Sequence, residues 1–146
     1  MLLNISYNSD KNQELIFSLV GKPYNLCSLF KVGKIGSPRL QIISASKEIS
    51  DLLLYDNNIN WCNIELRPKG IIFRFRSLLE TYGLIVPYYK LTLFKSDPNE
   101  YSFYCDTIKI KVLSNTKNSI DFIKKILIQK NKKFCKLNSK IKNQVC

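Results

Sequence analysis

Arginine is concentrated in one short segment of a chain that otherwise carries its positive charge as lysine. The sequence has 19 Lys and 4 Arg, and three of the arginines, Arg67, Arg74 and Arg76, lie in RPKGIIFRFRS. A planar guanidinium group can bond a carboxylate or phosphate through two N–H groups at once and can stack on a ring, whereas the lysine ammonium cannot. The pattern indicates that planar geometry, and not charge alone, is needed in this segment.

The surrounding residues have the pattern of a β-hairpin. Pro68 and Gly70 suit a tight turn at RPKG, so positions whose numbers sum to 137 face each other across the two strands. Since side chains alternate between the faces of a strand, one face carries only apolar residues and is expected to be core. The opposite face carries Arg74, Arg76 and Trp61, so both arginines are predicted to point outward beside the tryptophan.

Two uses of these arginines stay open. Arg74 could pair with Glu65 on the facing strand, and Arg76 could stack on Trp61, each contact being worth roughly 0.2–1 kcal/mol. Alternatively the cations form a strip that binds an anionic ligand, and a guanidinium already held in place binds more tightly. The candidate ligand-binding residues are Trp61, Arg67, Lys69, Arg74 and Arg76.

The C-terminal part is strongly basic. The formal net charge is +12, and residues 117–146 hold nine Lys and one Asp. A basic segment can bind nucleic acid phosphates or an anionic surface. Composition bias is the alternative, because Ile, Lys and Asn fill 51 of 146 positions. If nucleic acid is the partner, exposed aromatics such as Tyr88 and Tyr104 would assist, and the accessory basic patch would be Lys132, Lys133, Lys136 and Lys140.

The sequence offers little for catalysis, and we expect no enzyme, no metal site and no cofactor. There is no His, the usual general acid or base at neutral pH, and no glycine-rich phosphate loop. The five cysteines have no CxxC spacing, so free thiols in a reducing compartment are expected. The apolar runs are too short to span a membrane and no secretory signal is recognisable, which predicts a cytoplasmic protein.

Periodicity predicts strands followed by a helix. Residues 2–7 alternate like a short strand, residues 10–20 suit a helix or a buried strand, and residues 25–46 suggest two strands about a glycine turn. A short helix should follow Ser44 or Ser46. Strand-like runs cover 61–66, 70–76, 84–95, 100–105 and 107–112. A closing helix capped by Asn115 or Thr116 completes a single domain, 1–129, and a basic tail or helix extension, 130–146, is expected to fray.

The segments IELRPKGIIF, IVPYYKLTLF and SIDFIKKIL, within residues 64–128, resemble the bacterial pleckstrin-homology-like (GRAM-like) family. The core segment is also similar to a group of small Bacteroidetes proteins without an assigned activity. The resemblance implies a curved antiparallel sheet or partly open barrel closed by a helix. It implies little about the ligand, because such domains bind phosphoinositides, peptides or protein partners, or have no known ligand.

The predicted fold class is α+β, with a strongly curved antiparallel sheet or partly open barrel capped by a C-terminal helix. The predicted function is a non-enzymatic cytoplasmic binding module that recognises a protein or anionic ligand through the hairpin. Nucleic-acid binding by the basic tail is the alternative.

Overall fold

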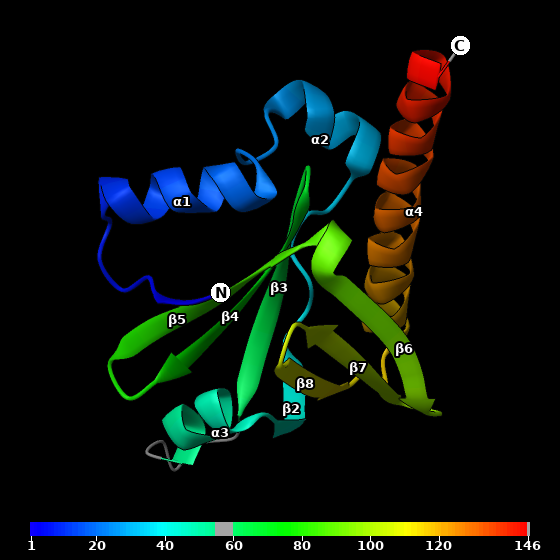
Figure 1. Ribbon diagram of the computed structural model, residues 1–146. Coiled ribbons are helices and arrows are strands. Elements are labelled where there is room, and N and C mark those ends of the chain that lie inside the picture. Colours follow the sequence, from blue (N-terminus) through cyan, green and yellow to red (C-terminus); the bar gives the residue numbers. More distant parts are fainter. Residues whose placement is uncertain (55–59, 146) are drawn as a thin grey trace.

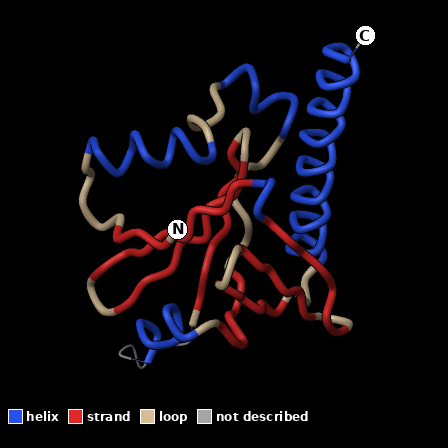
Figure 2. Tube along the Cα trace, viewed as in Figure 1, coloured by secondary structure: helices blue, strands red, loops and turns tan. Residues whose placement is uncertain are grey.

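Eight antiparallel strands and a long C-terminal helix dominate the architecture (Figures 1 and 2). The computed structural model describes the backbone of residues 1–54 and 60–145, and the side chains of the same residues except 134–139 and 141–145. The helices are α1 (Asp10–Val20), α2 (Leu26–Val32), α3 (Lys47–Leu54), the short 3₁₀-helix η1 (Tyr88–Lys90) and α4 (Lys117–Val145). The strands are β1 (Leu2–Asn4), β2 (Leu40–Ala45), β3 (Trp61–Arg67), β4 (Gly70–Ser77), β5 (Glu80–Pro87), β6 (Leu91–Asp97), β7 (Glu100–Cys105) and β8 (Ile108–Leu113).

The strands form one open sheet in the order β1-β5-β4-β3-β2-β8-β7-β6. Strands β1 and β6 are its edges, and within the described strands they do not pair with each other. The α+β class, the antiparallel sheet and the C-terminal helix are confirmed. The predicted strong curvature and barrel-like closure are wrong, since the sheet is neither closed nor strongly curled. Closure is unnecessary because helices, and not further strand pairs, cover the core.

Different helices cover the two faces of the sheet. Helix α4 contributes Phe122, Ile123 and Ile126 to the main core, in which the rings of Phe73 on β4 and Phe103 on β7 meet edge to face at 4.8 Å. On the other face, α1 lies over β4 and β5 and forms a small second cluster. The members of that cluster are Val20, Ile72 and Ile85, with Leu3, Ile16 and Leu19 packed against them.

The predicted register of the β3–β4 hairpin is confirmed. The observed pairs run from Cys62↔Phe75 to Arg67↔Gly70, so their numbers sum to 137 as expected. Phe73 and Phe75 are buried, whereas Arg74 and Arg76 are exposed on the opposite face. Burying each phenylalanine contributes about 1.5–3 kcal/mol, and a one-residue slip would expose both rings.

The segment from residue 10 to residue 46 is more helical than predicted. Of the two alternatives for residues 10–20, the helix is observed; its N-cap is Ser9, and Gly21 ends it at φ 88°. Residues 26–32 form helix α2, so the strand predicted there is wrong. The Asn25 side chain accepts a hydrogen bond from Ser28 N at 2.9 Å, which caps a helix too short to have a clear apolar period.

The run from residue 84 to residue 95 is also not one strand, because η1 divides it into β5 and β6. Pro87 cannot donate to a strand ladder. The following Tyr88 is buried, and its hydroxyl donates a hydrogen bond to the Arg67 carbonyl at 3.2 Å. The chain therefore leaves the half of the sheet that contains β5 and enters the half that contains β6.

Helix α4 is longer than predicted. Thr116 caps it, as expected, by accepting a hydrogen bond from Ser119 N at 3.2 Å. The helix continues to Val145, so the helical extension is observed in place of the frayed tail that we favoured. No helix within the described residues has the length and apolar character needed to cross a membrane.

Gly70 allows the hairpin tip to pack tightly, and this packing can be tested. A methyl group at Gly70 would collide with the Val86 carbonyl oxygen and lie 2.6 Å from Val20 Cγ1. We expect Gly70→Ala to lower the free energy of unfolding by about 3 kcal/mol or more, measured by urea denaturation. Gly36→Ala is the control, because no atom lies within 4 Å of its added carbon. Equal stability of the two variants would contradict the packing described.

Candidate functional site

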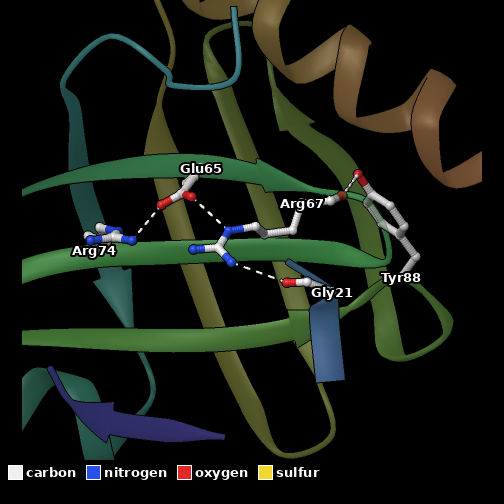
Figure 3. Close-up of polar contacts among 5 residues, drawn as sticks. All are labelled: Gly21, Glu65, Arg67, Arg74 and Tyr88. Carbon is white, nitrogen blue, oxygen red and sulfur yellow. Dashed lines mark hydrogen bonds and ion pairs between the residues drawn. The ribbon is translucent and has the colours of Figure 1, made fainter. Parts of the chain in front are cut away.

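Glu65 lies between two of the predicted arginines (Figure 3). Its Oε1 accepts a hydrogen bond from Arg67 Nε at 2.7 Å, and its Oε2 accepts one from Arg74 Nη2 at 2.5 Å. The predicted Arg74–Glu65 pair is therefore present. Arg67 takes part in the same network from the other side.

Arg67 is buried, unlike the exposed ligand-binding residue that the sequence suggested. Its side chain is only 7% exposed, and Nη1 donates to the Gly21 carbonyl at 3.1 Å (Figure 3). Gly21 ends helix α1, which packs over this end of the sheet. The Arg67 guanidinium thus connects α1 to β3 by hydrogen bonds. Its charge is paired with Glu65 inside the protein.

Arg74 and Arg76 lie farther from α1, on the open part of the same face. The Arg74 side chain is 43% exposed although Glu65 holds it. Arg76 is exposed, and its side chain makes no ion pair or hydrogen bond with any residue that the structure describes. Both guanidinium groups are accessible to a ligand.

The predicted stacking of Arg76 on Trp61 is wrong. The β3–β4 register begins at Cys62↔Phe75, so Trp61 and Arg76 are not paired across the hairpin. The cation over the indole ring is instead Arg39, whose Cζ lies 5.1 Å from the ring centroid. Arg39 was missed because nothing in the sequence shows that the residue just before β2 lies beside Trp61 on β3.

We use the term arginine face for Arg39, Trp61, Asn63, Arg74 and Arg76. Asn63 is exposed and faces Arg74 across the hairpin. Glu65 is the one carboxylate in ion-pair contact with the four arginines among the described residues, so the formal charge of arginines plus Glu65 is 4 − 1 = +3. The arrangement can therefore accept an anionic group without first breaking an ion pair of Arg39 or Arg76.

Lys69 is separated from this face. It is exposed at the hairpin tip, where its N–H donates to Val20 O and its carbonyl accepts from Tyr88 N. Five residues of strand, roughly 16 Å, separate it from Arg74. Lys69 lines a different groove together with Lys22, Tyr24 and Pro68.

The accessory basic patch lies on α4. Lys132 and Lys140 are exposed and Lys133 is half-buried, while the Lys136 side chain is outside the described residues. Figure 1 shows the C-terminal half of α4 extending past the ends of the strands. The patch is thus on a different element from the arginine face.

Tyr88 and Tyr104, the two aromatic residues predicted to be exposed, have different environments in the structure. Tyr88 is buried and hydrogen-bonded, so that prediction is wrong for it, and burial raises the pKa of its hydroxyl. Tyr104 is half-buried and stacks on Phe94 with ring centroids 5.4 Å apart, while Lys109 lies over its ring at 5.3 Å. This stack lies on β6–β8, away from the hairpin.

Two of the three described thiols, those of Cys62 and Cys105, are buried. Burial raises the pKa of Cys62 to about 12 and also raises the pKa of Cys105, so both are protonated at neutral pH. Cys27 is exposed and unpaired with another cysteine. Within the described residues, no group of three or more His, Cys, Asp or Glu side chains is placed to hold a metal ion.

Comparison of the chain with protein-family models, curated proteins and solved structures gave no match.

The different roles of Arg67 and Arg74 predict different losses of stability. Arg67→Ala removes a buried cation and leaves the Gly21 carbonyl without its donor, so we expect a loss of about 2–3 kcal/mol in the free energy of unfolding. Arg74→Ala removes a partly exposed pair and should cost less than about 1 kcal/mol. Urea denaturation of both variants makes the comparison; equal losses would mean that Arg67 is not the anchor.

Proposed function

We propose that this protein is a non-enzymatic cytoplasmic binding module that recognises a protein or anionic ligand through the arginine face. The observation that carries the proposal is the exposure of Arg39, Arg74 and Arg76 on one sheet face with a single carboxylate, Glu65, already engaged twice. Guanidinium groups in this setting favour carboxylate or phosphate, which they can bond through two N–H groups.

Preorganisation supports the same proposal. The bond to Glu65 restricts Arg74, and the ring of Trp61 restricts Arg39, so each loses less conformational freedom when a ligand binds. Arg76 and Asn63 then supply donors beside them. Because the face is built on strands of a packed sheet, it keeps its shape without a ligand.

The pleckstrin-homology-like assignment remains part of the proposal. Its support is the C-terminal helix that packs on the core of an antiparallel sheet, whereas the open sheet lacks the barrel-like closure that the resemblance implies. The free thiols of Cys27, Cys62 and Cys105 are compatible with a reducing compartment.

Nucleic acid is the second candidate partner. The continuous α4 helix, with exposed Lys132 and Lys140, favours it, as does the stack of Phe94, Tyr104 and Lys109. The charges near that aromatic stack weaken the case for a nucleic-acid partner. Lys111 on β8 pairs with Asp97 and Glu100, so part of the positive charge near the stack is already neutralised.

Affinity purification from cytosolic extract, with and without nuclease, tests the proposal. We expect Arg74→Ala combined with Arg76→Ala to weaken capture of the partner about 100-fold or more, because each charged hydrogen bond contributes about 1.5–3 kcal/mol. Lys47→Ala combined with Lys95→Ala is the matched control, since it removes the same charge from other exposed positions. Removing residues 130–146 should leave capture unchanged.

A nucleic-acid partner predicts the reverse pattern. Nuclease or removal of residues 130–146 would then abolish capture, and log affinity would fall by roughly 0.7 per single-strand phosphate contacted for each unit of log salt. If the double arginine variant folds and captures the same partner as tightly as the original protein, the arginine face is not the binding site.

A further inference from the structure

A second groove lies between the extended segment that precedes β2 and the beginning of α4. Its volume is about 570 Å³. One wall is the backbone of residues 34–38, and the other is the α4 surface formed by residues spaced three or four apart. The lining residues of that helix are Asn118, Asp121, Phe122 and Lys125.

The segment offers an unpaired strand edge to this groove. Ile35 and Ser37 bond β3 through Leu66 N→Ile35 O at 2.7 Å and Ser37 N→Ile64 O at 2.8 Å. Gly36, between them, pairs with β3 only as an isolated bridge residue. Successive residues of a strand direct their polar groups to opposite edges. Within the described residues, the N–H and C=O of Gly36 make no hydrogen bond.

Two lysines give one end of the groove a positive charge. Lys125 Nζ donates to the Lys34 carbonyl at 2.8 Å, which brings the two residues together. Burial and the charge of Lys34 lower the pKa of Lys125. An ammonium group that burial disfavours gains from an anion bound beside it. Asp121 lines the groove as well and lies one helical turn before Lys125, so an anion is favoured at the lysine end.

We propose that this groove binds an extended acidic peptide segment of a partner protein. The peptide backbone pairs with Gly36 as an added strand, a carboxylate lies against Lys34 and Lys125, and an apolar side chain lies against Phe122 and Pro38. Strand addition of this kind obtains affinity from main-chain hydrogen bonds and specificity from the flanking side chains.

Other occupants fit less well. A small anion would use the two lysines but leave the free polar groups of Gly36 without a partner. A second copy of this chain carries a formal charge of +12 and would be repelled by a basic groove. An acidic extended peptide satisfies both the charge and the backbone.

The groove lies beside the arginine face, because Gly36 pairs with Glu65 as an isolated bridge. It uses different charged side chains, Lys34 and Lys125, so charge variants test the two proposals independently. Gly36 offers a blocking variant, because a carbon added there meets no atom within 4 Å and its φ is not in the left-handed region. Gly36→Val should therefore fold and add bulk at a residue that lines the groove. Lys125→Gln removes the charge yet keeps a donor for Lys34 O, and Lys124→Gln is the matched control on the exposed side of the helix.

The experiment is selection of a randomised octapeptide library on the full chain, with counter-selection against Gly36→Val. We expect enriched peptides that carry Asp or Glu. A selected peptide, labelled with fluorescein, should bind Lys125→Gln about tenfold more weakly and Lys124→Gln or the Arg74→Ala, Arg76→Ala protein unchanged. On binding, hydrogen exchange of the Gly36 amide should slow.

Three results would overturn the proposal. One is an absence of enrichment over the counter-selection while Gly36→Val retains the thermal stability of the original chain. Another is enrichment of peptides without acidic residues. The third is binding that inorganic phosphate displaces completely while the Gly36 amide exchanges at its original rate, which would identify a small-anion pocket.

Discussion

The Glu65 carboxylate accepts hydrogen bonds from two guanidinium groups that face different surroundings. Arg67 lies beneath the end of α1 and bonds the Gly21 carbonyl, whereas Arg74 lies on the open face. A buried cation without a partner is costly, so we expect this carboxylate to stabilise the packing of α1 on the sheet. The same carboxylate orients Arg74 toward the open face. One residue thereby links the stability of the fold to the geometry of the candidate site.

The outer face of the β3–β4 hairpin is divided into two parts by α1. Near the hairpin tip, Ile72 and Ile85 are covered by Val20 and form a small apolar cluster. Beyond Glu65 no helix of the described part of the chain lies over this face of the strands, and the positions are polar or aromatic. An apolar residue at Arg76 would be exposed there, and an arginine at Ile72 would be buried without a carboxylate. The change from Ile to Arg along β4 follows the edge of the helix.

The parts of the fold that local rules determine were predictable from the sequence. The Pro68–Gly70 turn and the alternation of Phe and Arg were sufficient for the hairpin register. Helix α2 was missed because seven residues do not establish a period, although Asn25 and Gly33 were usable cap signals. The burial of Arg67 and the stacking of Arg39 on Trp61 depend on which distant segments pack against β3. A single sequence without that pairing information cannot supply them.

Arginine side-chain NMR is the most direct test that Arg67 is structural while the other arginines are available to ligand. The chain has four arginines and hence four Nε–H signals. With inorganic phosphate as the probe, the signals of Arg39, Arg74 and Arg76 should shift, while the Arg67 signal should stay fixed and exchange slowly with solvent. A rapidly exchanging Arg67 signal that shifts together with the other three would contradict the burial of Arg67 against Glu65 and Gly21. It would also contradict the division of the hairpin face into a structural part and an open part.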